Sequence, residues 1–306
     1  MSDPFRKSPP RLTGWKNTVR RLSCATPDFP TKRRWLEMVF RRELRMAGLL
    51  EMPLPGTDGL LFTIPPGSVI GHEVLLYGLY EKDVVRCFES LIAPGDLVLD
   101  IGANLGQYTL LASNRAGAAG QVISIEPVPH IHRQLVRHLQ VNGITNVTTI
   151  EAALGKEDGS VLMTIIADEN DGMHHVAETE SPESFRVLQR RLDDVIREAA
   201  PQREVSVMKI DVEGWEENVF AGAEQVLAQH VPPTIFFECI EDHATRFGLS
   251  AHRLVTRFRS LDYRIFSVAA SESPRELADG PPPIGICNLI ACHRRHTAHL
   301  ARLLPS

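Results

Sequence analysis

Short apolar runs bounded by turn residues alternate along the chain with stretches in which apolar residues recur at helical spacing. This alternation predicts an open α/β sheet. The expected strands cover residues 60–64, 97–101, 121–125, 147–150, 161–166, 205–212, 234–237, 263–268 and 287–291, and the last two are expected to form a hairpin with a long connection. The expected helices cover residues 31–50, 80–92, 108–112, 130–142, 215–229 and 251–261.

The most informative stretch is a buried strand followed by the turn Gly102-x-x-x-Gly106 and a helix. In an open α/β sheet, the crevice beyond the carboxyl end of such a strand binds ligands. The turn departs from the dinucleotide fingerprint, because Asn104 stands where a second glycine would let a pyrophosphate approach. Asp100, just before the turn, would repel phosphates and suits a ligand with an ammonium or sulfonium group. These residues favour a nucleoside without phosphates, above all S-adenosylmethionine. The alternative is an ordinary strand-to-helix corner.

Glu126 ends the next predicted strand and is followed by Pro127. It comes at close to the ~20-residue distance at which a carboxylate binds ribose hydroxyls in such folds. The alternative is a surface glutamate that caps the following helix. The third strand, at 147–150, is followed by residues 151–153, and the end of this strand would lie near an adenine ring.

Three ionisable residues alternate along the strand expected at 205–212 and would share one face: Lys209, Asp211 and Glu213. Such a face is costly inside a sheet unless it opens on a site near the strand's carboxyl end. Glu238, at the end of the next strand, would open onto the same crevice. The alternative is a structural ion pair between Lys209 and a neighbouring carboxylate.

His174 and His175 lie in a polar segment and are candidates for a base or a metal ligand; a lid or a plain loop is the alternative.

Composition is that of an ordinary globular protein, with 43% hydrophobic and 23% charged residues, so no fibrous or disordered class is indicated. The five cysteines are odd in number and form no Cys-x-x-Cys pair, which favours a reducing compartment over a disulfide framework. With no apolar run long enough for a membrane span and no signal peptide, the expected location is the cytoplasm.

Lys and Arg exceed Asp and Glu within residues 1–45, so the rest of the chain is acidic and a poor match for nucleic acid. The basic helix expected at 31–50 suits peripheral contact with an anionic membrane or a partner, or it packs on the domain with a solvated face. The run Met52-Pro53-Leu54-Pro55-Gly56 predicts a linker. The predicted organisation is a basic extension and linker at 1–59, a ligand-binding domain at 60–296 and a tail at 297–306.

Taken in order, several motifs between about Leu60 and His293 resemble the FkbM family of S-adenosylmethionine-dependent methyltransferases. They are Tyr80-Glu81, the segment 94–106 (PGDLVLDIGANLG), Ile125-Glu126-Pro127, Ala153-Leu154-Gly155, Leu192-Asp193-Asp194, the segment 209–214 (KIDVEG) and Phe237-Glu238. Trp215 departs from the family, which often has a small residue or His there. Residues 1–55 fall outside the resemblance.

The resemblance implies a Rossmann-like class I methyltransferase fold, with a seven-stranded, mostly parallel sheet that has one antiparallel strand and helices on both faces. It implies S-adenosylmethionine held by the Gly102–Gly106 turn, with the ribose on Glu126. Members are commonly O-methyltransferases that act on hydroxyls of sugars, glycans or other small metabolites. The residues expected at the cofactor are Glu81, Asp100, Gly102, Ala103, Asn104, Gly106, Tyr108, Thr109, Glu126, Pro127, Glu151, Ala152, Ala153 and Asp211.

Methyl transfer to a hydroxyl needs a general base or a metal that lowers the pKa of the hydroxyl. Asp211 is the first choice to orient or deprotonate the acceptor, assisted by Glu213 and Lys209 with Glu238 nearby. A divalent ion among Asp211, Glu213 and Glu238 is compatible with the sequence but not required by it. Magnesium or calcium would suit these carboxylates better than zinc, because no His stands at the three positions.

Three other functions remain open on the sequence. A nicotinamide-dependent oxidoreductase would share the sheet, but Asn104 argues against its diphosphate loop. A non-catalytic adaptor that binds S-adenosylmethionine is disfavoured by the intact Asp100, Glu126 and Asp211. A nucleic-acid methyltransferase is favoured only by the basic N-terminal segment, and the Asn/Asp-Pro-Pro-aromatic motif of base-amino enzymes is absent from the sequence.

Overall fold

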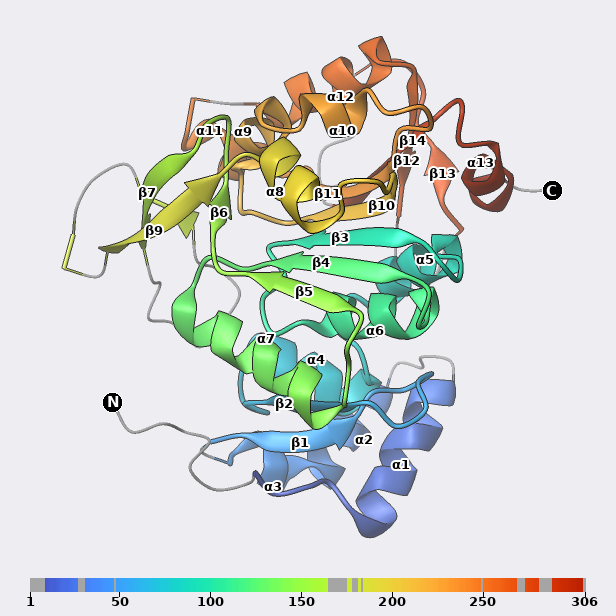
Figure 1. The fold of residues 1–306 in the computed structure, drawn as a ribbon. Coiled ribbons are helices and arrows are strands. Elements are labelled where there is room, and N and C mark those ends of the chain that lie inside the picture. Colours follow the sequence, from blue (N-terminus) through green and yellow to red (C-terminus); the bar gives the residue numbers. More distant parts are fainter. Residues whose placement is uncertain are drawn as a thin grey trace.

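The structure, a computed structural model, describes residues 9–26, 31–46, 48–164, 175–177, 181–182, 184–248, 250–268, 273–280 and 288–304. A central sheet of eight strands crosses the molecule in the order β13-β12-β14-β11-β10-β3-β4-β5 (Figure 1). Its strands are β3 (Leu97–Ile101), β4 (Gln121–Ile125), β5 (Val147–Ile150), β10 (Val205–Ile210), β11 (Thr234–Glu238), β12 (Tyr263–Ser267), β13 (Arg275–Glu276) and β14 (Asn288–His293).

Strands β5, β4, β3, β10 and β11 pair in parallel, and β14 runs antiparallel between β11 and β12. This confirms the predicted mostly parallel α/β sheet, and the predicted terminal hairpin is the pair β12–β14. The short β13 pairs with the outer edge of β12 and adds an eighth strand to the seven expected. After β3 the chain builds the sheet toward β5, and then returns to the other side of β3 with β10. The topological switch point, where such sheets bind ligands, therefore lies between β3 and β10.

The strands alternate between two apolar layers with the period of two that a pleated strand imposes. In β3, Leu97, Leu99 and Ile101 pack into one core, while Val98 packs into the other. One layer of helices comprises α5 (Lys82–Leu91), α6 (Gln107–Ala116), α7 (Pro129–Val141) and α13 (Thr297–Leu303), and the other comprises α8 (Leu192–Ala199), α9 (Glu216–Ala221), α10 (Glu224–Leu227) and α12 (Ala251–Ser260). The predicted placement of helices on both faces is confirmed.

The N-terminal part packs below the layer of α6 and α7 (Figure 1) and differs from its prediction. It contains α1 (Gly14–Ala25), α2 (Lys32–Val39), α3 (Arg41–Leu44), β1 (Leu50–Pro53), β2 (Leu61–Ile64) and α4 (Val69–Tyr77). The helix predicted at 31–50 is interrupted at the buried Phe40 and ends before β1. The predicted linker is wrong at Met52 and Pro53, which pair with β2 in a hairpin that spans residue 59, the predicted end of the extension.

A smaller sheet has the order β6-β9-β7-β8, with β6 (Ala153–Leu154), β7 (Gly159–Thr164), β8 (His175–Val176) and β9 (Ser184–Arg190). The apolar pattern predicts only β7 of these strands. The helix predicted at 215–229 divides into α9 and α10 at Gly222. The chain passes close to another segment there, since a Cβ on Gly222 would lie 2.2 Å from the carbonyl oxygen of Gly155. The Asp193 carboxylate then accepts from the backbone N–H groups of Gln225 and Val226 at the start of α10.

Across the described ranges, the helices are too short or too polar to cross a membrane.

Candidate active site

Two adjoining cavities open beside the carboxyl ends of β3, β4, β10 and β11. The first has about 670 Å³ of empty volume and is lined by seven of the predicted cofactor residues: Gly102, Asn104, Glu126, Pro127, Ala152, Ala153 and Asp211. The second, of about 740 Å³, is lined by Glu81, Ala103, Gly106, Tyr108, Lys209 and Glu238 and shares Asn104, Asp211 and Glu213 with the first. The structure thus brings together most of the residues that the sequence selects.

The Gly102 turn requires glycine. Gly102 has φ +72°, and a Cβ on it would lie 1.9 Å from the carbonyl oxygen of Asp211. The backbone N–H groups of Gly102 and Ala103 both donate to the carbonyl of Ile125, and the N–H of Asp211 donates to Ile101. These bonds lock the turn against the end of β4 and against the segment that carries Asp211.

Glu126 is buried and holds two loops together. Its Oε2 accepts from the backbone N–H of Asn104 at 2.8 Å, and its Oε1 accepts from that of Val128 at 2.9 Å. Burial raises the pKa of this carboxyl to about 7, although the two hydrogen bonds oppose the shift. A carboxylate offers about four lone-pair sites, so acceptor capacity remains on the side that lines the cavity. The Val128 N–H that donates to Glu126 lies directly before α7. Glu126 therefore also satisfies a donor at the start of this helix, as the alternative of a capping role expects.

Asp100 and Thr109 are both fully buried and are absent from the lining of the two cavities in the described part of the chain. The Thr109 hydroxyl donates to Asp100 Oδ2 at 2.6 Å, beneath α6. Asp100 is also the register partner of Lys209 on the neighbouring strand. Burial raises the pKa of Asp100, with Lys209 opposing the shift. The cofactor contact expected for Asp100 and Thr109 stays a prediction.

Lys209 forms the ion pair that the sequence left as an alternative. Its Nζ lies 3.0 Å from Asp211 Oδ2 and 4.7 Å from the centre of the Tyr108 ring. Burial lowers the pKa of Lys209, but the carboxylates of Asp211 and Asp100 outweigh it and raise the pKa overall, so the lysine is cationic. Strand β10 ends at Ile210, so the prediction that Asp211 and Glu213 continue one strand face is wrong.

Glu81 lines the second cavity. Its carboxylate accepts from Tyr108 Oη at 3.1 Å and from Asn288 Nδ2 at 2.9 Å. The predicted Glu151 is exposed and pairs with His132 at 3.3 Å, so its neighbours Ala152 and Ala153, but not its carboxylate, face the first cavity.

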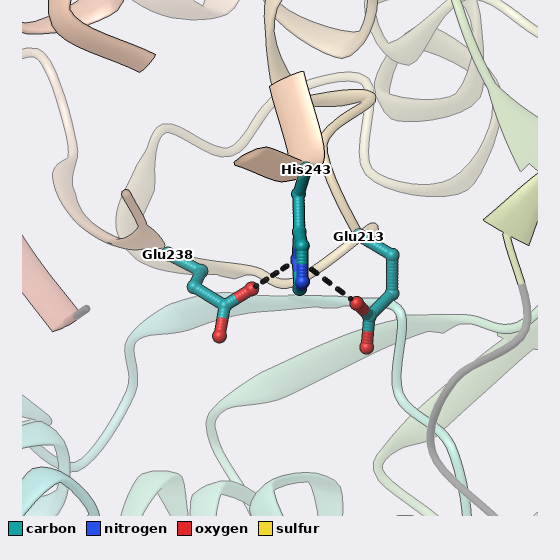
Figure 2. A group of neighbouring side chains, drawn as sticks. All are labelled: Glu213, Glu238 and His243. Carbon is teal, nitrogen blue, oxygen red and sulfur yellow. Dashed lines mark ion pairs between the residues drawn. The ribbon is translucent and has the colours of Figure 1, made fainter. Parts of the chain in front are cut away.

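Glu213 and Glu238, which the sequence selects, both line the second cavity, and His243, which the sequence reasoning missed, lies between them. His243 Nδ1, from α11 (Glu241–Thr245), lies 3.2 Å from Glu213 Oε2 and 3.4 Å from Glu238 Oε2, and Figure 2 shows the ring between the two carboxylates. Burial, followed by the charge of Asp211, raises the pKa of Glu213 to about 8 and that of Glu238 to about 9. One ligand atom from each of the three side chains lies within 4.8 Å of the others. The only sequence signal is that His243 closely follows Glu238.

Trp215, the departure from the family pattern, lines the first cavity. Its indole N–H donates to the carbonyl of Leu154 at 3.1 Å, and its ring contacts Phe247 edge to face. Of the two histidines predicted as a base or metal ligand, His174 lies outside the described residues, and only the backbone of His175, in β8, is described.

Comparison with known proteins shows which family the chain matches. Residues 100–265, more than half of the chain, match the family described as the methyltransferase FkbM domain. "Methyltransferase 1" of Beauveria bassiana is 25% identical over 158 residues, which cover 45% of this chain and 63% of that protein. "Hexuronic acid methyltransferase AglP" of Haloferax volcanii is 24% identical over 164 residues, 54% of this chain and 63% of that protein. The chain therefore spans less than two thirds of the length of both relatives.

Among solved structures, the chain is similar to a precorrin-6y C5,15-methyltransferase from Geobacter metallireducens. The TM-score is 0.40 at 16% identity, and the match covers 70% of this chain and 88% of that one.

Proposed function

We propose, from the premise that the chain belongs to the methyltransferase FkbM domain family, that it transfers the methyl group of S-adenosylmethionine to a hydroxyl of a sugar, a glycan or another small metabolite. The observation that carries the proposal is the pair of adjoining cavities at the switch point of the sheet. The first cavity contains Glu126, a buried carboxylate suited to accept from ribose hydroxyls. The second contains Asp211 with its ion-pair partner Lys209.

The first cavity suits the nucleoside end of the cofactor. Glu126 has acceptor capacity for ribose hydroxyls, and Ile131, Met163 and Trp215 supply walls for an adenine ring. Asn104 and Asp211 stand where this cavity meets the second one. The methionine end of the cofactor and its sulfonium would then enter the acidic second cavity, beside Asp211.

The chemistry assigned to the second cavity is an in-line displacement. The acceptor oxygen forms a bond to the methyl carbon, the carbon–sulfur bond breaks, and its electron pair stays on sulfur to give S-adenosylhomocysteine. The hydroxyl proton passes to the carboxylate of Asp211, which Lys209 holds in place at 3.0 Å. The cofactor supplies the reactive carbon, so the protein's part is to align the acceptor and receive its proton.

The acceptor is proposed as a sugar hydroxyl because one relative is named as a hexuronic acid methyltransferase. The second cavity offers several side chains that can form hydrogen bonds with sugar hydroxyls: Tyr80, Glu81, Gln107, Tyr108, Lys209 and Glu238. A nucleic-acid acceptor would call for a basic groove instead.

We also propose that the protein acts in the cytoplasm and contacts anionic membranes through its N-terminal helices. Trp15 and Leu22 of α1 and Trp35 and Met38 of α2 are exposed, and Leu22 and Trp35 line one apolar groove. The same two helices also expose Arg21, Arg33 and Arg34, as in helices that lie on anionic lipid. Sedimentation with vesicles of phosphatidylcholine and phosphatidylserine should bring down the protein, and a Trp15→Ser/Trp35→Ser variant should stay in solution.

The decisive experiment for the activity has two parts. Calorimetry should detect binding of S-adenosylhomocysteine, and labelled S-adenosylmethionine should transfer its methyl group to a sugar fraction of a cell extract. Asp211→Asn should lower turnover by more than ~100-fold while leaving affinity for S-adenosylhomocysteine within a few-fold of wild type. The exposed Asp242→Asn is the matched control. Heat with NADH but none with S-adenosylhomocysteine would overturn the proposal in favour of an oxidoreductase.

A further inference from the structure

We propose that Glu213, Glu238 and His243 together bind a divalent first-row transition cation at the wall of the second cavity. Glu213 comes from the turn after β10, Glu238 ends β11, and His243 lies in α11 (Figure 2). Side chains from three separate segments thus present one ligand atom each within 4.8 Å of one another.

The backbone brings these segments together directly. A Cβ on Gly214 would lie 2.4 Å from the carbonyl oxygen of His243, so only glycine lets the turn after β10 approach α11 this closely. The preceding residue, Glu213, has φ +55°, a conformation that costs a non-glycine residue of order 1 kcal/mol or more. This conformation accompanies the approach of Glu213 Oε2 to His243.

The charges around the cluster favour a cation. Asp211 and Glu216 place further carboxyl groups near both Glu213 and Glu238, and Glu81 adds another near Glu238. Lys209 pairs with Asp211, and Arg246 offsets only part of the charge at Glu213. A bound divalent ion would turn the repulsion between the two glutamates into shared attraction.

The donor set determines the class of metal. The sequence alone suggests magnesium or calcium on Asp211, Glu213 and Glu238, an all-oxygen set. In the structure Asp211 is paired with Lys209, and an imidazole nitrogen joins the two glutamates instead. Two carboxylates with one imidazole suit manganese, iron or zinc better than magnesium or calcium, which prefer oxygen alone.

The site also leaves room for a substrate. Glu213 and Glu238 line the second cavity, so a metal that they hold would face its open space and keep positions for other ligands. A metal with open positions lowers the pKa of a hydroxyl that binds to it. This role rests on the proposed function: the acceptor hydroxyl would ligate the metal, while its proton still passes to Asp211 and the methyl group still leaves sulfur. Binding of the metal itself does not depend on that function.

The test is a titration of the full chain, first stripped with EDTA and dialysed, with manganese chloride, in which electron paramagnetic resonance measures free Mn²⁺. One Mn²⁺ should bind per chain, and zinc chloride should displace it. Glu238→Gln and His243→Gln should each weaken binding by more than ~10-fold. Glu224→Gln and His230→Gln, matched substitutions at exposed positions, should leave it unchanged. Thermal melting confirms that each variant is folded.

The outcomes separate the two proposals. Absence of Mn²⁺ binding, or equal binding by folded Glu238→Gln and His243→Gln, would overturn the metal site whatever the activity. Stoichiometric Mn²⁺ binding without any methyl transfer would leave the site standing and remove the proposed function. Full methyl transfer by the stripped chain in EDTA would overturn the role of the metal in activating the hydroxyl.

Discussion

The Glu126 carboxyl should make cofactor affinity depend on pH. In the free protein, burial raises the pKa of this carboxyl from its ordinary value of 4.5 to about 7. Ribose hydroxyls donate to the ionised form, so only that fraction of the protein binds well. With a pKa of about 7, about 3% of the carboxyl is ionised at pH 5.5 and about 90% at pH 8, which predicts a ~30-fold gain in affinity over this interval.

Calorimetry with S-adenosylhomocysteine at pH 5.5 and pH 8 measures this gain. Asp100 and Lys209 act on the Glu126 charge, and other carboxyls of the site titrate in the same range, so the variant Glu126→Gln is the necessary control. Gln keeps the shape and removes the titration. Its affinity should be low and much less dependent on pH than that of wild type.

The same carboxyl affects the stability of the free protein in the opposite direction. Between pH 4.5 and 7 the folded state holds the Glu126 proton and the unfolded state does not, so the free energy of unfolding falls as pH rises. A shift of this size corresponds to roughly 3 kcal/mol, and Glu126→Gln should remove that slope from urea titrations. Equal pH dependence of affinity in wild type and Glu126→Gln would refute the assignment of the ribose to this carboxyl.

Two further substitutions test the packing that supports the site. Gly102→Ala should lower turnover by ~100-fold, because its Cβ would push the Asp211 carbonyl by more than 1 Å and misplace the proposed proton acceptor. The strained backbone should also lower the melting temperature, so steady-state kinetics are measured below the melting transition of the variant, and wild-type rates there would contradict the reasoning. Arg20→Met should destabilise the fold by roughly 3 kcal/mol or more, since buried Arg20 donates to the carbonyls of Pro53, Val74 and Gly78. Urea unfolding against the exposed Arg21→Met checks it, and equal midpoints would show that these carbonyls find other donors.

The inner strands of the central sheet were predictable because they are buried on both faces, and β3, β4, β10 and β11 each read as an apolar run. The exposed edge strand β13 has no such run and was not predicted. Elements with a weaker contrast between hydrophobic and polar positions were not predicted. Helix α4 is apolar nearly all round, because α1 and α2 cover it, so no polar face marks its period. In β9 the buried positions are Val187 and the polar Gln189, so the hydrophobic alternation of a strand is absent.

Residues of the candidate site were predictable where a residue type suited to bind a ligand stands at the end of a predicted strand or just after it, as at Gly102, Glu126 and Glu238. Contacts made by packing between distant segments left no such signal. The nearness of His243 to Glu213 depends on the approach of α11 to Gly214, and no spacing in the sequence encodes that approach. The burial of Asp100 beneath α6 likewise follows from the face of β3 on which it lies, which the motif alone does not reveal.

One feature constrains how the protein can move during a catalytic cycle. Because Gly102 packs against the Asp211 carbonyl and the Ile101 carbonyl accepts from the Asp211 N–H, the Gly102–Gly106 turn and the segment that carries Asp211 are held together as one block. Under the proposed function, an opening that lets acceptor in and product out would have to come from another wall of the second cavity, such as the one that Ile70 of α4 provides. Substrates would then exchange without a change in the distance between the turn and Asp211.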